Sequence, residues 1–159
     1  MSTKMLTAWA GILLLISVSL SAKTFINIPT GRNPKFTSSI NPKYTSSINP
    51  KYTSSINPKY TSSINPKYNA KLDPTKNRWS GYFLFSVDGK FSGVIVKANH
   101  VCMLLFTPSG HWVGYFISNG DRGFNFFDNE GEWRGYLLPN GARNWNLFNT
   151  SAEWKGFTT

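Results

Sequence analysis

"FFDNEGEWRGY", residues 126 to 136, sets the turn-forming letters DNEG between aromatic residues and continues with Trp133, Gly135 and Tyr136. A short polar residue at the start of a tight turn, with glycine three positions later, is typical of a type I turn closed by a left-handed residue. That turn joins the two strands of a β-hairpin. The stretch therefore predicts a hairpin in which Phe127 faces Trp133.

The same pattern occurs four times, with 21 residues between copies. Its first phenylalanine stands at Phe85, Phe106, Phe127 and Phe148. The second aromatic residue stands at Phe91, Trp112, Trp133 and Trp154, and the next glycine at Gly93, Gly114, Gly135 and Gly156. The turn glycine is Ala152 in the last copy, where we expect a looser or different turn. Four copies in one register predict a repeat architecture with a shared core.

Two strands in each copy give eight short antiparallel strands, and closing them into a ring removes exposed edges. We therefore expect an all-β fold, a small closed eight-stranded barrel of four hairpin repeats, over residues 78 to 159. Residues 79 to 159 contain 18 aromatic residues, and both faces of the strands look apolar. A barrel has one interior, so part of this surface should meet a bilayer, an acyl or glycan ligand, a second copy, or the chain's own N-terminal segment.

From residue 33 the chain reads "NPKFTSSI NPKYTSSI NPKYTSSI NPKYTSSI NPKY", an eight-residue unit that ends at Tyr68. Proline in every unit opposes a helix or a central strand, and one isoleucine per unit offers little apolar area to offset the entropy of ordering. We therefore expect residues 22 to 77 to form an extended or disordered tether that folding of the barrel does not need.

Charge divides the chain at the same place. Residues 1 to 77 carry ten Lys and Arg against one acid, and residues 78 to 159 carry seven against six. The repeated lysines are candidates for contact with an anionic lipid surface or cell-wall polymer: Lys35, Lys43, Lys51, Lys59 and Lys67. The alternative is a spacer that the lysines keep solvated.

The first residues resemble a secretory signal. Lys4 precedes an apolar run over residues 5 to 20, and small residues follow near Ala22. This order predicts a signal peptide over residues 1 to 21 and export to a periplasmic, cell-surface or secreted location, with an uncleaved anchor as the alternative.

Few residues favour catalysis. Cys102 is the one cysteine, and with His100 and His111 it lacks the paired spacing of a zinc site. Glu130 and Glu132 could form a carboxylate pair, but acidic residues in hairpin turns are ordinarily solvated. We expect no enzyme, no metal and no cofactor.

Residues 79 to 159, with the motif F-x-x-x-G-x-W-x-G-Y, resemble the four-fold beta flower domain of uncharacterised bacterial proteins. The resemblance implies a shallow, symmetric all-β barrel with hairpin petals and no established activity. Phe91 in place of Trp and Ala152 in place of Gly depart from the motif, and the octapeptides lie outside it.

We expect a non-enzymatic envelope or surface module that binds lipid or another hydrophobic ligand through the barrel mouth. The candidate ligand-binding residues are Phe91, Trp112, Trp133 and Trp154. The alternative is a carbohydrate-binding or adhesive module that uses the tryptophan ring, because indoles stack on sugar faces. We expect no nucleic-acid partner, and the sequence sets no oligomeric state.

Overall fold

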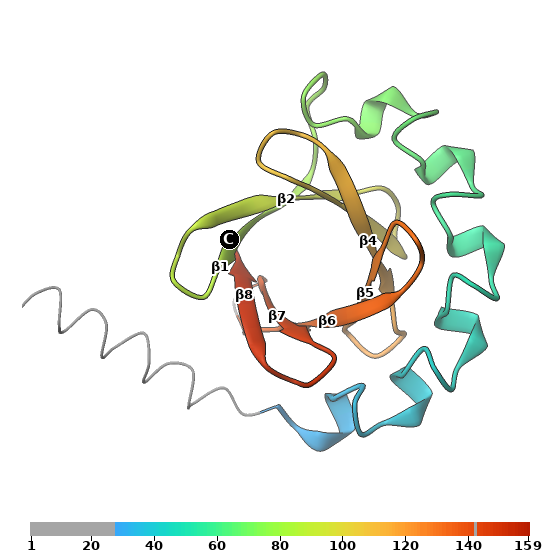
Figure 1. Ribbon diagram of the computed structural model, residues 1–159, viewed down its shortest axis with the longest axis vertical. Helices are drawn as coiled ribbons and strands as arrows, with labels where there is room; N and C mark the ends of the chain where they lie inside the picture. Colours follow the sequence, from blue (N-terminus) through green and yellow to red (C-terminus); the bar gives the residue numbers. More distant parts are fainter. Residues whose placement is uncertain (1–27, 142) are drawn as a thin grey trace, which may run out of the picture.

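The computed structural model describes residues 28 to 141 and 143 to 159. Within these residues, eight antiparallel strands pair in sequence order and close into a barrel (Figure 1). The strands are β1 (Gly81–Ser86), β2 (Phe91–Lys97), β3 (Cys102–Phe106), β4 (Trp112–Ser118), β5 (Phe124–Asp128), β6 (Trp133–Pro139), β7 (Trp145–Asn149) and β8 (Trp154–Thr158). The predicted all-β barrel of four hairpins is confirmed. The predicted signal peptide and residues 22 to 27 lie outside the described residues.

Each hairpin closes with the tight turn that the sequence predicts. In the first hairpin the amide of Gly89 donates to the carbonyl oxygen of Ser86 at 2.9 Å. The amide of Ser86 donates to the carbonyl oxygen of Lys90 at 2.8 Å. In the fourth hairpin the amide of Ala152 donates to the carbonyl oxygen of Asn149 at 3.0 Å, and Ala152 has a φ of 67°. Our expectation of a looser turn is therefore wrong, because the alanine adopts the left-handed conformation of the glycines it replaces.

Neighbouring hairpins meet at a glycine. A Cβ atom on Gly135 would stand 2.1 Å from the carbonyl oxygen of Phe148 in the next hairpin. The indole nitrogen of Trp133 donates to the carbonyl oxygen of Gly135 at 2.8 Å. The same close approach occurs at each junction, at Gly93, Gly114, Gly135 and Gly156. The glycine two residues after the second aromatic residue of each copy therefore encodes the contact between hairpins, and Gly156 against Phe85 closes the ring.

Side chains from the inner face of the strands fill the barrel. Because successive residues of a strand point to opposite faces, Phe116 faces inward while Tyr115 and Ile117 face outward. The inner cluster comprises Leu84, Ile95, Met103, Leu105, Phe116 and Leu137, with Tyr82, Phe124, Phe126, Trp145 and Leu147 packed against it. Protein side chains thus occupy the space that a ligand in the barrel mouth would need.

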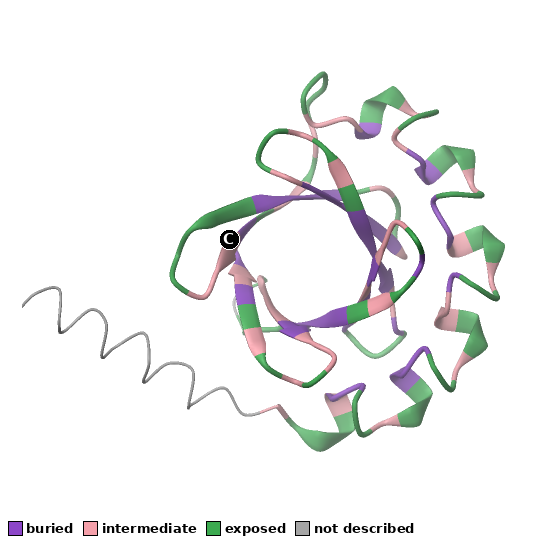
Figure 2. Ribbon diagram, in the orientation of Figure 1, coloured by how far each residue is buried: buried purple, intermediate pink, exposed green. Residues whose placement is uncertain are grey.

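Residues 28 to 77, which we call the arc, do not form the extended or disordered tether that we expected. They wind around the outer face of the barrel, and buried residues of the arc lie on the side toward it (Figures 1 and 2). Within the described residues the arc contains six short 3-10 helices: η1 (Thr30–Arg32), η2 (Ser38–Ile40), η3 (Ser46–Ile48), η4 (Ser54–Ile56), η5 (Ser62–Ile64) and η6 (Ala70–Leu72). None of the helices in this part of the chain is long and apolar enough to cross a bilayer.

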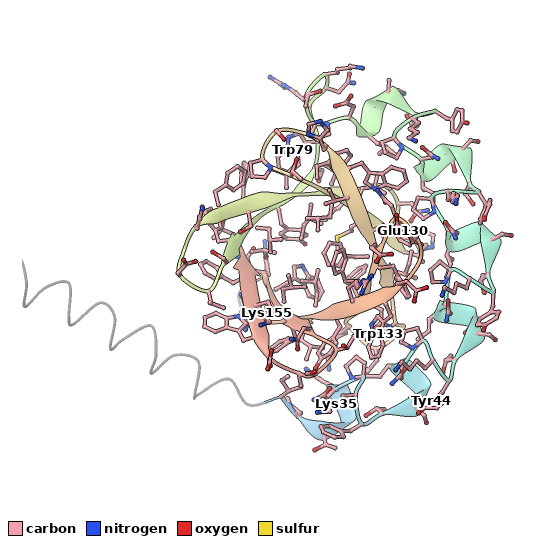
Figure 3. All side chains as sticks on the ribbon, viewed as in Figure 1. Lys35, Tyr44, Trp79, Glu130, Trp133 and Lys155 are labelled. Carbon is pink, nitrogen blue, oxygen red and sulfur yellow. The ribbon has the colours of Figure 1, made fainter. Side chains whose placement is uncertain are left out.

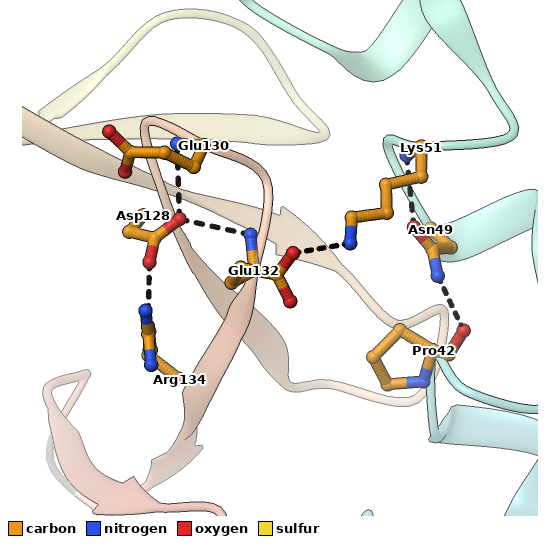
Figure 4. A network of polar contacts seen from close by, with 7 residues as sticks. All are labelled: Pro42, Asn49, Lys51, Asp128, Glu130, Glu132 and Arg134. Carbon is orange, nitrogen blue, oxygen red and sulfur yellow. Dashed lines mark hydrogen bonds and ion pairs between the residues drawn. The ribbon is translucent and has the colours of Figure 1, made fainter.

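Each octapeptide folds around its own asparagine. The side-chain oxygen of Asn49 accepts from the amide of Lys51 at 2.9 Å, and its nitrogen donates to the carbonyl oxygen of Pro42 in the preceding unit at 2.8 Å (Figure 4). The backbone oxygen of Asn49 accepts from the amides of Tyr52 and Thr53 at 3.0 and 3.1 Å. Proline has no amide proton, so its place in the turn leaves no donor without a partner. The unit therefore satisfies much of its backbone locally.

The isoleucines of the arc pack on the barrel. Ile40 and Ile64 are 4% and 1% exposed. The carbonyl oxygen of Ile40 accepts from the side-chain nitrogen of Asn125 on β5 at 3.0 Å. Four outward-facing rings beneath the arc are at most 2% exposed: Tyr115, Phe127, Tyr136 and Phe148. The arc and the outer face of the barrel thus share a second core, and we expect removal of the arc to destabilise the barrel, contrary to the sequence analysis.

Two octapeptides match one hairpin. Lys35 Nζ donates to the carbonyl oxygen of Ser151, at the tip of the β7–β8 hairpin, at 3.5 Å. Lys51, 16 residues later, places its Nζ 2.5 Å from Oε1 of Glu132 at the tip of the β5–β6 hairpin. After a further 16 residues, Lys67 lines a groove at the tip of the β3–β4 hairpin. The spacing of the octapeptides is therefore fixed by the spacing of the hairpins.

The strained turn gives a direct test. Replacing Ala152→Gly should raise the free energy of unfolding by about 1 kcal/mol, because a left-handed alanine costs about 1 to 2 kcal/mol and glycine gives part of that back as chain entropy. Gly89→Ala is the matched control and should lower stability, because φ is 81° there. An added Cβ atom would meet nothing within 4 Å, so the loss would come from the backbone conformation alone. Urea unfolding measures both, and a loss of stability in Ala152→Gly would contradict the assigned turn.

Candidate functional site

The four candidate ligand-binding residues lie near the hairpin tips on the outer side of the barrel: Phe91, Trp112, Trp133 and Trp154. Trp133 lies between the barrel and the arc, where it packs in two outer clusters (Figure 3). The indole nitrogens of Trp112 and Trp154 donate to glycine carbonyls of their own strands at 2.9 and 2.7 Å. Phe91 is 40% exposed. These rings have structural partners, and a tryptophan ring that binds a ligand stays a prediction.

The candidate lysines divide into two groups. Lys35 and Lys51 bond to hairpin tips, and the hydrogen bond with Glu132 raises the pKa of Lys51. Lys43 Nζ lies 5.9 Å from the ring centroid of Trp133. The other two lysines, Lys59 and Lys67, line the groove at the β3–β4 tip. Contact of all five with an anionic surface stays a prediction, and three of them already have partners on the barrel.

The two glutamates considered as a catalytic pair belong to a turn network (Figure 4). Asp128 accepts from the amides of Glu130 and Glu132 at 3.1 and 2.9 Å and from Nε of Arg134 at 2.6 Å. Burial raises the pKa of Asp128, but the hydrogen bonds from Glu132 and Arg134 outweigh burial and lower the pKa below its ordinary value. The network holds the turn in place and orients Glu132 toward Lys51.

The cysteine and the histidines do not meet as a catalytic group. Cys102 is fully buried in the outer cluster, the group of outward-facing and arc side chains that includes Ile64, Tyr115 and Phe127. His100 and His111 are exposed. Burial raises the pKa of the Cys102 thiol to about 12. Among the described residues, no group of three or more His, Cys, Asp and Glu could hold a metal ion. Cys102 thus packs as a small apolar residue.

An aromatic face lies on β1, β2 and β8, on the side of the barrel away from the arc (Figure 1). It consists of Phe83, Phe85, Phe91 and Phe157, and Trp79 adjoins it at the end of the arc, where Trp79 also packs near Ile64 and Leu72. The ring centroid of Phe83 lies 5.3 Å from that of Trp79 and 6.1 Å from that of Phe91. Phe85 connects Phe91 to Phe157, with centroid distances of 5.9 and 5.7 Å. Phe83 and Phe91 are 47% and 40% exposed and the other rings are half-buried, so this face presents apolar rings to solvent.

At the β8–β1 junction, two phenylalanines stand where other hairpins make polar contacts with the arc. Phe83 occupies the position of Asn125, whose side chain bonds to the arc. Phe157 occupies the position of Tyr136, whose hydroxyl donates to Oδ1 of Asn33 at 2.9 Å. Phenylalanine therefore replaces both polar contacts at one junction. Both residues are visible in the sequence, but only the pairing of β1 with β8 places them on neighbouring strands.

Basic side chains border the aromatic face. Arg78 and Lys90 are exposed neighbours of Trp79 and Phe91 in the chain, and neither has an ion-pair partner among the described residues. Arg78 also lines, with Lys76, Trp79 and Phe83, a shallow hollow of about 670 Å³. Apolar rings beside exposed cations are the chemistry of a surface that meets lipid head groups.

No family model, curated protein or solved structure matches this chain. The resemblance of residues 79 to 159 to the four-fold beta flower domain therefore stays a prediction.

The buried thiol can be tested directly. Because its raised pKa leaves little thiolate, Cys102 in the folded protein should react with N-ethylmaleimide at pH 8 at least about 100 times more slowly than in urea. Mass spectrometry of timed samples measures the rate. Modification of the folded protein at the unfolded rate would show that the outer cluster opens or is not formed.

Proposed function

We propose that the protein is an exported, non-enzymatic surface module that attaches to anionic lipid membranes through its aromatic face. One observation carries the proposal: the face that the arc leaves uncovered is lined by contacting aromatic rings and bordered by exposed cations. Export rests on the predicted signal peptide, and the site of attachment differs from the barrel mouth that the sequence suggested.

The apolar part of the face supports contact with lipid. Phe83 and Phe91 are 47% and 40% exposed, and both belong to the chain of ring contacts that runs from Trp79 to Phe157. The rings beneath the arc that are equivalent to Phe85 and Phe157, such as Phe127 and Tyr136, are at most 1% exposed. Fully burying a phenylalanine side chain contributes about 1.5 to 3 kcal/mol, and Phe83 and Phe91 each have somewhat less than half of that still to gain, which suits weak, reversible attachment. Aromatic side chains also favour the interface between acyl chains and water.

The basic border favours an anionic bilayer over a second copy of the chain. Lys76 and Arg78 line the hollow beside Trp79, and each cation near an anionic surface contributes about 1 kcal/mol. Nζ of Lys76 lies 3.5 Å from Oδ2 of Asp73, so Lys76 is already in an ion pair. Arg78 is in none of the ion pairs of the described residues and is the cation more available to a phosphate group. Two copies that met through this face would bring their cations together. A phosphate-bearing bilayer instead supplies opposite charge around an apolar layer.

Vesicle sedimentation tests the proposal with residues 22 to 159, which omit the apolar run that would bind vesicles by itself. The double variant Phe83→Ser with Phe91→Ser should bind vesicles of phosphatidylglycerol and phosphatidylcholine at least about tenfold more weakly, because two apolar rings are lost. The matched control is Tyr44→Ser with Tyr52→Ser, which removes two rings that are 74% and 73% exposed on the arc. This control should bind as the unchanged protein does.

Two further outcomes decide the matter. Arg78→Gln should weaken binding to anionic vesicles and leave the weak binding to pure phosphatidylcholine unchanged. Loss of binding in the arc variant with full binding in the face variant would place the contact on the arc and overturn the proposal. Equal binding of all variants would overturn it as well.

A further inference from the structure

A groove lies between the arc and the β3–β4 hairpin, next to the hollow beside Trp79, with which it shares Lys76. Its volume is about 720 Å³, within the range of about 300 to 1,000 Å³ that small-ligand sites occupy. The side chains that give it chemical character are Lys59, Lys67, Tyr68, His111, Trp112 and Asn129. Aromatic, cationic and amide groups therefore converge on one concave space.

The repeat explains why this groove is cationic. Lys51 pairs with Glu132 at the tip of the β5–β6 hairpin. Lys67 lies two octapeptides after Lys51, and His111 occupies in the β3–β4 hairpin the position that Glu132 occupies in the β5–β6 hairpin. Histidine thus stands where the equivalent tip holds the acidic partner. Neither Lys67 nor Lys59 has an ion-pair partner among the described residues.

The two tips differ in their acids as well. The β5–β6 tip reads "DNEGE", residues 128 to 132, with three acidic side chains, and the β3–β4 tip reads "TPSGH", residues 107 to 111, with none. Asp73 is the one acid among the residues that line the groove, and it is engaged with Thr75 and Lys76. The ion pair that joins arc to barrel at one hairpin is therefore replaced by an open, positively charged groove at the next.

The walls of the groove fit a sugar ring. Trp112 is half-buried, and its indole nitrogen is committed to Gly114, so the ring is held in a fixed orientation. Tyr68 is 76% exposed at the same groove. Asn129 donates to the carbonyl oxygen of Trp112 at 2.9 Å, and its Oδ1 has no partner among the described residues. A flat aromatic wall beside hydrogen-bonding groups accepts the apolar face and the hydroxyls of a sugar.

We propose that this groove binds a negatively charged sugar residue of a surface glycan, with Trp112 against the sugar ring and Lys59 and Lys67 on its acidic group. The occupant is a saccharide that carries a carboxylate or a phosphate. The site shares Lys76 with the hollow beside the aromatic face, but it contains neither Phe83 nor Phe91. Substitutions at Lys67 and at the two phenylalanines therefore test the two sites separately. Together the two sites would hold a membrane and a glycan on one molecule.

Titration calorimetry of residues 22 to 159 with tetragalacturonate tests the proposal. Binding should be lost, or weakened at least about tenfold, in Lys67→Gln, and Lys43→Gln, three octapeptides earlier, should bind normally. Trp112→Phe should also weaken binding while the protein stays folded, because Phe91 fills the same position in the first hairpin. The methyl ester of the same oligosaccharide, which keeps the rings and lacks the charge, should not bind.

The sharpest variant is His111→Glu, which restores at this tip the acid that pairs with lysine at the β5–β6 tip. It should abolish tetragalacturonate binding with no loss of thermal stability and with vesicle binding unchanged. Unchanged affinity in His111→Glu or in Lys67→Gln would overturn the site. Binding of inorganic phosphate as tightly as the oligosaccharide would overturn the saccharide assignment, and equal binding of the methyl ester would overturn the role of charge.

Discussion

Packing of the octapeptide isoleucines on the outer face of the barrel is the interaction on which the rest of the structure depends. Beneath the arc, Tyr115, Phe127, Tyr136 and Phe148 are almost fully buried, whereas Phe85 and Phe157, in the equivalent positions of the fourth junction, stay partly exposed. A strand whose two faces are both apolar needs two cores. The barrel interior supplies one, and the arc supplies the other. Where the arc ends, the outer face becomes a surface available to a partner.

The arc also imposes a register, and departures from that register mark the candidate sites. Two octapeptides span one hairpin, so every unit must place its asparagine, lysine and isoleucine at the same points, which gives a physical reason for the close similarity of the copies. Where the hairpins keep the matching group, as at Glu132, the contact joins arc to barrel. Where they change it, to His111 or to Phe83, a groove or an apolar face remains open.

The barrel could be predicted from local signals in the sequence. The arc could not, because its structure depends on packing against residues far away in the chain. The turn residues and the 21-residue spacing fixed the hairpins, because each turn is decided by a few neighbouring residues. The octapeptide was misjudged because one isoleucine per unit was weighed alone, although the barrel provides the apolar surface that it covers. The chain's own N-terminal segment was among the partners that the sequence left open for that surface. The tryptophans were located correctly on the strands, but their partners could not be predicted without the arc. The aromatic face needed the register between the first and last strands.

Hydrogen exchange of the intact protein tests most directly whether the octapeptides fold on the barrel. The amides of Tyr44, Tyr52 and Tyr60 each donate to the asparagine carbonyl three residues earlier at 3.0 Å. If the arc and the barrel form one cooperative unit, these amides should exchange only on global unfolding, with the same free energy of opening as Leu137 in the core. Exchange of the three amides at the rate of an unstructured chain, while Leu137 stays protected, would contradict the account.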